Sequence, residues 1–234
     1  MAKDCFTFKL FSVHQDRCAM KVGTDGTLLG AWANAPEGKC RILDIGTGTG
    51  LIALMMAQRY PHAEITGIDI ATNACLQANE NVMISPFLDR INIENSNIIE
   101  FESEPFDAIV SNPPYFVNSL ICPDVERTNA RHSDSLSYRD LFKHACRLLS
   151  DEGIFSLVIP SDSMSLIESE AAVEGLFLSK KYFIKTTPKK NPKRILLEFL
   201  KHSPEKIEIS EEVLETSPNV RSEWYRNLTN DFYL

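Results

Sequence analysis

The sequence has no hydrophobic run approaching the roughly 20 residues that a helix needs to cross a bilayer, so no membrane-spanning segment is expected. Its first residues also lack the basic-then-apolar pattern of an export signal. Its six cysteines include no Cys-x-x-Cys pair, which disfavours both a disulfide framework and a zinc site. These absences predict a cytoplasmic protein with reduced thiols and no bound metal.

Positive charge is also scarce. Lys and Arg number 24 against 32 Asp and Glu, which gives a net charge of −8. Such a chain has no overall attraction for nucleic acid, so any contact with RNA must come from a local basic patch. What is present is length and apolar content: 234 residues, 44% of them hydrophobic, suffice for one large α/β domain.

Strand-like and helical patterns alternate along the chain. This alternation predicts a doubly wound α/β fold, with a mostly parallel seven-stranded sheet covered by helices on both faces. The last two strands have no helix between them, so we expect them to form an antiparallel hairpin at one edge. The expected strands are 41–46, 64–70, 90–93, 106–111, 153–160, 181–185 and 195–200, and the expected helices are 51–59, 71–85, 138–149 and 163–173.

A glycine-rich stretch, Asp-Ile-Gly-Thr-Gly-Thr-Gly at 44–50, ends the first of these strands. Glycines at such a place let the backbone turn sharply and approach a ligand closely. The spacing is not the Gly-x-Gly-x-x-Gly of NAD-binding proteins, because Leu51 stands where the third glycine would be. Asp44 suits a ligand with an ammonium group. Asp69, about 20 residues after the glycines, stands where an acid can bind ribose hydroxyls.

A second candidate functional motif, Asn-Pro-Pro-Tyr at 112–115, follows the strand at 106–111. Proline has a fixed φ and no N–H, and it restricts the residue before it, so the stretch forms a rigid corner. Asn112 and the carbonyl of Pro113 then present hydrogen-bond acceptors, and Tyr115 presents a flat face. Such a corner suits a planar group that bears an NH2.

These motifs resemble the class I S-adenosylmethionine-dependent methyltransferases. The block Met-Lys-Val-Gly-Thr-Asp-Gly at 20–26 is similar to the bacterial tRNA1(Val) adenine-37 N6-methyltransferases, as are Ala-Arg-His at 130–132 and Asp-Phe-Tyr-Leu at 231–234. The resemblance spans nearly the whole chain. It implies a Rossmann-like methyltransferase domain over 1–234, in which residues 1–38 form an extension that closes over the cofactor.

The resemblance also implies a role for each matching residue. S-adenosylmethionine would be held along the glycine stretch, at the strand end that carries Asp69, and by the extension. The implied cofactor-binding residues are Thr24, Asp25, Asp44, Gly46, Gly48, Gly50, Asp69, Ile70, Asn97 and Asn112. Asn97 stands where such enzymes often have an Asp at the adenine amino group, and its amide oxygen can accept the same hydrogen bond. A turn followed by a helix capped at Thr24 or Asp25 is an equally good interpretation of that segment.

The expected catalytic residues are Asn112, Pro113, Pro114 and Tyr115. The lone pair of an exocyclic adenine amine is delocalised into the ring, so the amine is a poor nucleophile. Acceptors for both amino hydrogens, at Asn112 Oδ1 and the Pro113 carbonyl, would make the nitrogen more pyramidal and free its lone pair. Tyr115 would stack on the base. This is catalysis by positioning and fixed dipoles, and the base must first leave its stack.

Two regions are candidates for RNA contact. The long stretch 116–137 contains Arg127, Arg131 and His132, and a loop of this length inside a domain is often functional. A second region is a basic cluster whose charges could contact phosphates. Its members are Lys180, Lys181, Lys185, Lys189, Lys190, Lys193, Arg194 and Lys201, and the RNA contacts expected among them are Lys189, Lys190, Lys193 and Arg194. The alternatives are a solvated loop histidine and a solvated edge hairpin guarded by lysines. Phe6, Phe8, Phe11, Trp224 and Leu228 are expected to pack in the domain.

Two other functions stay open. A glutamine N5-methyltransferase of peptide release factors would face the same NH2 chemistry, but about 40 residues before Asp44 are too few for the helical domain that such enzymes carry. A cofactor-binding RNA module without catalysis is the other. The expected partner is tRNA, and we expect a monomer.

Overall fold

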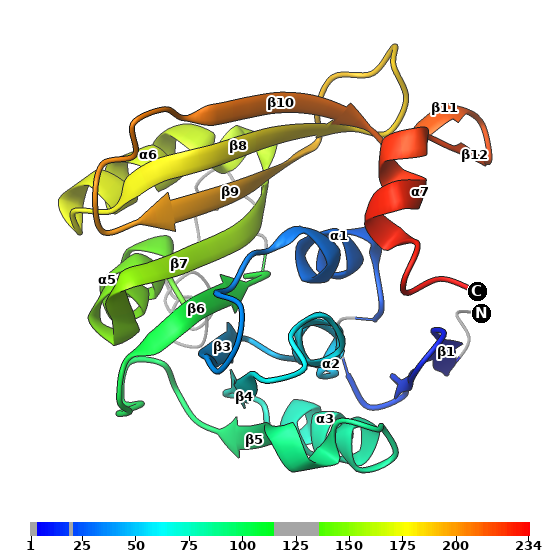
Figure 1. Cartoon of the computed structure of the whole chain (residues 1–234), viewed down its shortest axis with the longest axis vertical. Coiled ribbons are helices and arrows are strands. Elements are labelled where there is room, and N and C mark those ends of the chain that lie inside the picture. Colours follow the sequence, from blue (N-terminus) through cyan, green and yellow to red (C-terminus); the bar gives the residue numbers. More distant parts are fainter. Residues whose placement is uncertain (1–3, 19–20, 115–135) are drawn as a thin grey trace, which may run out of the picture.

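The computed structural model describes residues 4–18, 21–114 and 136–234. Its centre is an eight-stranded sheet in the order β10-β8-β9-β7-β6-β3-β4-β5 (Figure 1). The strands are β3 (Arg41–Ile45), β4 (Glu64–Asp69), β5 (Ile91–Asn95), β6 (Phe106–Ser111), β7 (Leu149–Pro160), β8 (Phe177–Lys185), β9 (Arg194–Leu200) and β10 (Glu208–Val213).

Six α-helices and two short ladders complete the described structure. The helices are α1 (Thr24–Trp32), α2 (Leu51–Arg59), α3 (Thr72–Met83), α5 (Tyr138–Leu148), α6 (Met164–Val173) and α7 (Glu223–Thr229). Single 3-10 turns lie at η1 (Leu88–Arg90) and η2 (Ser161–Ser163). The ladders pair β1 (Cys5–Thr7) with β2 (Ser12–His14) and β11 (Glu215–Ser217) with β12 (Val220–Arg221). Among the helices of the described ranges, none has the length and apolar character needed to cross a bilayer.

The sheet is mostly parallel, as the sequence predicts. β9 runs antiparallel to both of its neighbours, β7 and β8, so the predicted hairpin is confirmed. The prediction of seven strands is wrong by one, because β10 adds to the sheet beside β8, in parallel. The sequence of β10, Glu-Ile-Ser-Glu-Glu-Val, is mostly polar because the strand lies at an exposed edge, so no hydrophobic pattern marks it.

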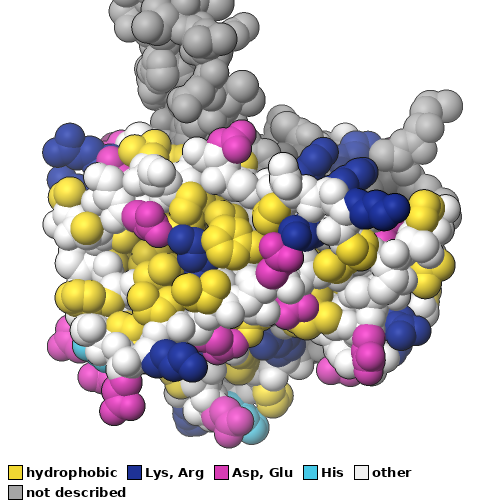
Figure 2. All heavy atoms as spheres, turned by 90° about the horizontal axis from the view of Figure 1, so that it is seen from above, with side chains coloured by type: hydrophobic (Ala, Val, Ile, Leu, Met, Phe, Trp, Pro, Cys, Tyr) yellow, Lys and Arg dark blue, Asp and Glu magenta, His cyan; other side chains and the backbone are white. Residues whose placement is uncertain are grey.

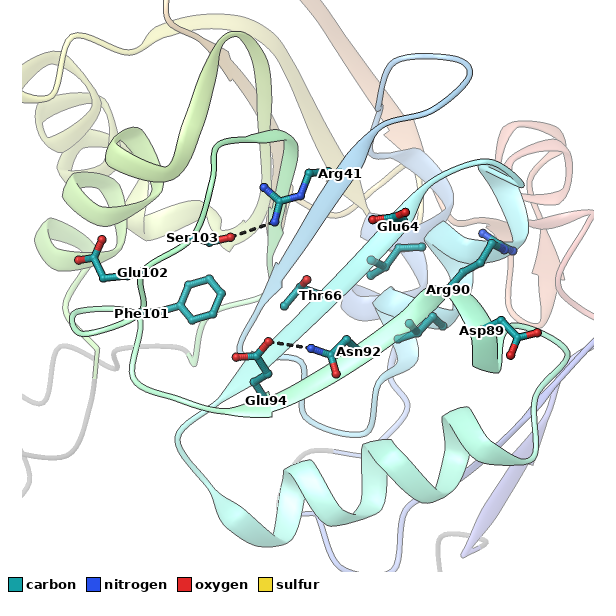
Figure 3. Close-up of a pocket in the computed structure, with 12 residues that line it drawn as sticks. Arg41, Glu64, Thr66, Asp89, Arg90, Asn92, Glu94, Phe101, Glu102 and Ser103 are labelled. Atoms are coloured by element: carbon teal, nitrogen blue, oxygen red, sulfur yellow. Dashed lines mark hydrogen bonds between the residues drawn. The ribbon is translucent and has the colours of Figure 1, made fainter.

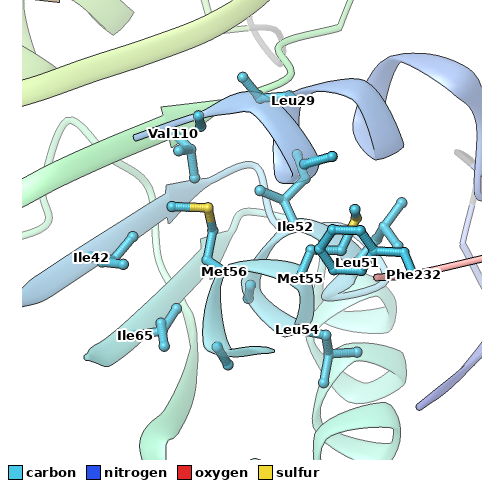
Figure 4. Packing of buried hydrophobic residues seen from close by; sticks show 14 of the residues in the cluster. Leu29, Ile42, Leu51, Ile52, Leu54, Met55, Met56, Ile65, Val110 and Phe232 are labelled. Carbon is cyan, nitrogen blue, oxygen red and sulfur yellow. The ribbon is translucent and has the colours of Figure 1, made fainter. Parts of the chain in front are cut away.

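Helices cover both faces of the sheet. Residues along β3 alternate between two hydrophobic clusters: Ile42 belongs to the cluster beneath α1, α2 and α3, and Leu43 and Ile45 belong to the one beneath α5 and α6. In Figure 4, Met56 of α2 points toward sheet residues Ile42 and Val110. This alternation, with its period of two, also turns Asp44 toward α2.

The amino-terminal segment and the tail pack together on the α1 side. Phe8 and Phe11 are buried, and the N–H of Lys9 donates to the carbonyl of Phe232 at 2.8 Å. Trp224 and Leu228 of α7 pack against the same hydrophobic cluster. The expectation that these aromatic and apolar residues belong to the domain is confirmed.

Candidate active site

The two motif-bearing strands end side by side. β3 and β6 are adjacent and parallel, with Ile45 opposite Ser111, and the Ser111 hydroxyl donates to the Ile45 carbonyl at 3.0 Å. The next residues on the two strands are Gly46 and Asn112. The glycine stretch and the Asn-Pro-Pro corner therefore lie at one edge of the sheet, as carboxyl ends of adjacent parallel strands must.

Asp44 is a buried carboxylate, and only one of its two oxygens accepts hydrogen bonds from the described residues. Its Oδ2 accepts hydrogen bonds from Thr47 Oγ1 at 2.7 Å and from the Ala53 N–H at 3.2 Å. Its Oδ1 is buried and has no hydrogen-bond partner among the described residues. Burial raises the pKa of Asp44 to about 7, although both hydrogen bonds lower it. An ammonium group at Oδ1 would satisfy this oxygen and favour the charged carboxylate.

The glycine stretch forms an open turn. Gly46, Gly48 and Gly50 have φ angles of +73°, +57° and +78°, which side chains rarely tolerate. The N–H groups of Gly46 and Thr47 both donate to the Ile68 carbonyl, at 2.9 and 3.0 Å. A Cβ built on Gly46 would meet nothing within 4 Å, so space lies beside the turn.

Asp69 links the turn to the next strand. Its Oδ2 accepts from the Gly48 N–H and its Oδ1 from the Ala71 N–H, each at 2.9 Å. Ile70 beside it is 55% exposed, which leaves an apolar surface for a flat ligand. Asn97 is exposed, and its Oδ1 already accepts from the Ile99 N–H at 3.1 Å.

Asn112 presents a second unsatisfied acceptor. Its Oδ1 is buried without a hydrogen-bond partner among the described residues. A Cβ built on Gly26 would lie 4.0 Å from Asn112 Nδ2 and 3.1 Å from Leu51 Cδ2, so a larger residue here would have to displace the Leu51 side chain by a few tenths of an ångström. Pro113 is buried and Pro114 is exposed. Four residues predicted for the site lie outside the described residues: Tyr115, Arg127, Arg131 and His132.

Comparison with known proteins agrees with this geometry. Residues 23–168 match the methyltransferase small domain family. A tRNA1(Val) (adenine(37)-N6)-methyltransferase of Phocaeicola vulgatus is 52% identical over 235 residues, covering 100% of this chain and 99% of the relative. The chain belongs to this family. A relative of the same name from Bacteroides thetaiotaomicron is 48% identical over 237 residues, with the same coverage of both chains.

Solved structures show the same fold for this methyltransferase. A predicted O-methyltransferase from Agrobacterium tumefaciens matches with a TM-score of 0.67 at 20% identity, over 89% of this chain and 96% of that one. A ribosomal protein L11 methylase from Lactobacillus delbrueckii matches with a TM-score of 0.55 at 19% identity, over 76% and 78%. Matches at this identity support the fold alone.

The N-terminal turn of α1 is tied to β9. Asp25 and Arg194 form an ion pair in which Nε and Oδ1 lie 2.5 Å apart, with side chains 20% and 19% exposed. The helix begins at Thr24, but its cap is Gly23, whose carbonyl accepts from the Thr27 N–H at 3.2 Å. The prediction of a helix here is right, and the prediction of a cap at Thr24 or Asp25 is wrong.

Most of the basic cluster of the methyltransferase is already engaged within the fold. Besides Arg194, four of its lysines have acidic partners: Lys180 with Glu198, Lys181 with Glu168, Lys185 with Glu211 and Lys201 with Asp151. In the described ranges, Lys189, Lys190 and Lys193 have no such partner, and all three are exposed. Figure 2 shows Lys and Arg side chains gathered toward one end of the face that β8 and β10 form.

Of two hollows, one lies away from the predicted site residues and the other is lined in part by two of them, Thr24 and Arg194. One of about 390 Å³ lies over β4 and β5 (Figure 3), but the guanidinium groups at its rim are committed to backbone carbonyls. Arg41 donates to the carbonyls of Glu104 and Pro105, and Arg90 donates to those of Ala57, Tyr60 and Ala63. The second, of about 350 Å³, is lined by residues that include Thr24, Arg194, Arg221 and Tyr233. The sequence reasoning missed Arg221, and the terminal motif at 231–234 was the signal that pointed to this region.

Proposed function

We propose that this chain is an S-adenosylmethionine-dependent methyltransferase that acts on N6 of an adenine in tRNA1(Val), at position 37. The observation that carries the proposal is the pair of buried oxygens, Asp44 Oδ1 and Asn112 Oδ1, which lack partners among the described residues and lie at one sheet edge. One oxygen suits an ammonium group and the other an amine N–H. The names of the full-length relatives support the choice of substrate.

The residues at this edge fit the cofactor, which supplies a methyl group bonded to a sulfonium. Asp44 would accept from its ammonium group, and the turn at Gly46, Gly48 and Gly50 leaves space for its methionine part. Asp69, whose carboxylate has lone pairs beyond its two backbone bonds, would accept from ribose hydroxyls. Ile70 would lie against the adenine.

Three further cofactor contacts are part of the proposal. Asn97 would take the adenine amino group with the remaining lone pair of its Oδ1. Thr24 and Asp25, at the start of α1 and within the segment 1–38, would close over the methionine end. Gly26 in the same turn lies close to Asn112, which supports a closing role for this segment.

The adenine amine would be activated by acceptors rather than by a strong base. Asn112 Oδ1 and the Pro113 carbonyl would each accept one amino hydrogen, which makes the nitrogen lone pair available for attack. Pro114 keeps the corner rigid. The family motif gives Tyr115 the role of stacking on the base. The methylated amine loses its extra proton after transfer.

RNA phosphates would meet the unpaired lysines at 189, 190 and 193. Arg194 lies next to them in sequence, but its guanidinium is occupied by Asp25. Arg127, Arg131 and His132 remain part of the predicted RNA contact.

Replacement of Asn112 tests the proposal. With labelled cofactor and bulk tRNA, we expect Asn112→Ala to slow methyl transfer at least ~100-fold, because one fixed dipole in a site of this kind contributes about that much. The dissociation constant of the cofactor should stay close to that of the unchanged chain.

A matched control is Asn79→Ala, since Asn79 is exposed on α3 and its amide donates to the Cys75 carbonyl of the same helix. This variant should transfer methyl at the normal rate. Label that enters a release-factor glutamine and not tRNA would contradict the proposed substrate. Label that enters neither would contradict methyl transfer itself.

A further inference from the structure

A hollow of about 350 Å³ lies beside the proposed site, between the start of α1, the β8–β9 loop and α7. Its volume falls within the range of small-molecule sites. Thr186 follows the end of β8 and Arg194 begins β9, so both lie at the sheet edge that carries Asn112. Thr24 and Gly26 belong to the same turn of α1, which rises about 5.4 Å. A Cβ built on Gly26 would lie 4.0 Å from Asn112 Nδ2, so this first turn of α1 borders both the hollow and the Asn112 corner.

The wall opposite α1 is aromatic and charged. The Arg221 guanidinium lies 4.2 Å from the centre of the Tyr233 ring and 5.7 Å from that of Tyr225. The two tyrosine hydroxyls lie 3.1 Å apart, and the Tyr233 ring stacks on Phe8 at 5.8 Å. The tail motif at 231–234 thus fixes a rigid platform under Arg221.

The charges at the hollow favour a nucleotide over a simple anion. Arg194 is neutralised by Asp25. The Arg221 guanidinium has no carboxylate or hydrogen-bond partner within the described ranges, which leaves one cation that lies over aromatic rings. Glu215 adds an acceptor, and the hydroxyls of Thr24 and Thr186 add groups that both donate and accept. Single-stranded RNA is recognised by this combination of an arginine plane or aromatic ring with polar groups for a base edge.

The lysines of the β8–β9 loop lie on the other side of the hollow. The N–H of Glu215 donates to the Thr186 carbonyl at 2.9 Å, and the N–H of Lys193 donates to the Ile184 carbonyl at 3.2 Å. These bonds join the hollow's rim to the base of the loop that carries Lys189, Lys190 and Lys193. An RNA strand that runs from the loop to Asn112 would pass this hollow.

We infer that the hollow binds a nucleotide of the substrate RNA adjacent to the methylated adenine, with its base stacked on Arg221. This inference rests on the proposed function. It assigns the chain a second, nucleotide-sized contact that would hold the RNA strand while the target base enters the Asn112 corner.

The test combines a protein variant with a changed RNA. Two full-length tRNAs are assembled, one with an abasic residue directly before the target adenine and one with an abasic residue directly after it. For each of these and for intact tRNA, kcat/KM is measured with the unchanged chain, Arg221→Ala and Arg226→Ala. Arg226 is the matched control, because it is an exposed arginine of α7 that does not line the hollow. Its loss changes the charge equally.

With intact tRNA, Arg221→Ala should lose about tenfold in kcat/KM, the loss expected when one stacked base is released. One abasic position should cost the unchanged chain a similar factor and cost Arg221→Ala nothing more. Arg226→Ala should behave as the unchanged chain does, and the cofactor dissociation constant should stay the same in all three.

Equal losses in the two arginine variants would overturn the inference, and so would an abasic effect of the same size in the unchanged chain and Arg221→Ala. Failure of the proposed function looks different. In that case the unchanged chain would transfer no methyl to intact tRNA, which would overturn both proposals together.

Discussion

The carboxyl group of Asp44 is the residue on which pH should act most strongly. Burial raises its pKa from 3.8 to about 7 in the folded chain. Between these two values the folded chain keeps a proton that the unfolded chain has released. The stability that this proton gives is present at low pH and falls as pH rises through the window, because the folded state binds more protons there.

Asp44→Asn should remove this dependence. The amide is neutral at every pH and can still accept from Thr47 and Ala53. As pH rises from 5 to 7, the free energy of unfolding of the variant should therefore increase by about 2 kcal/mol relative to that of the unchanged chain. Urea unfolding at both pH values measures this difference. The same variant should bind the cofactor more weakly, because it no longer offers a full negative charge to the ammonium group. A pH dependence that is identical in the two chains would contradict the raised pKa.

At this scale the sequence could place some of the predicted site residues relative to one another but not others, and the reason is physical. Asp44 and Asn112 sit at strand ends within short motifs, so local spacing was enough to place them together. Arg221 meets Thr24 only because the tail folds back onto the amino-terminal segment. A contact between such distant residues leaves no local pattern. The pairing of Arg194 with Asp25 was missed for the same reason. The RNA contact of Arg194, inferred from its place in the basic cluster, stays a prediction.

At the scale of elements, α1 is held over the site from two sides. Gly26 faces Asn112, and Asp25 is paired with Arg194 at the start of β9. Helix and strand are far apart in the sequence, so this ion pair fixes the start of α1 relative to the sheet. We expect the pair to act by positioning α1, since neither side chain needs to touch the reacting atoms.

A double-mutant cycle tests this role. Asp25→Asn and Arg194→Gln should each raise the cofactor dissociation constant and cost about 1–3 kcal/mol of unfolding free energy, less than a fully buried pair because both groups are about one-fifth exposed. The double variant should lose less than the sum of the single losses.

The matched control is the Lys185–Glu211 pair, which lies at the same sheet edge but is more exposed, with Glu211 54% exposed. Removing it should cost less than about 1 kcal/mol and leave cofactor binding unchanged. Additive losses at Asp25 and Arg194 would show that the two side chains act independently.

Elements were predicted well where apolar residues mark them. The expected helix at 51–59 agrees with α2, whose residues from Leu51 to Ala57 are all buried. The expected helix at 163–173 differs from α6 by one residue, and α6 buries Ile167 and Ala171, which are four residues apart on one face. The edge strand β10 escaped prediction because little of it is buried. The cap of α1 escaped because Gly23 has no side chain that could mark it as a capping residue.

For the whole molecule, the distribution of charge matters more than its sum. The net charge is −8, and most of the basic cluster is neutralised by acidic partners. The loop lysines at 189, 190 and 193 keep their full charge and lie at the same sheet edge as Asn112. An acidic chain can therefore bind RNA at one edge of the sheet while the rest of the protein surface repels RNA. This distribution of charge would orient the RNA toward the site.

The pair Lys189→Glu with Lys193→Glu should weaken tRNA binding and lower its salt dependence. The slope of log K against log salt should fall by about 0.7–0.9 for each RNA phosphate that the variant no longer neutralises. The matched control is Lys39→Glu with Lys206→Glu, two exposed lysines that precede β3 and β10 and so lie at the opposite edge. Both pairs change the net charge equally. If repulsion by the whole molecule governs binding, the two pairs will weaken it alike. If the loop is the RNA contact, only the first pair will, and cofactor binding will be the same in both, because no residue of either pair belongs to the turn at 46–50 or contacts Asp44.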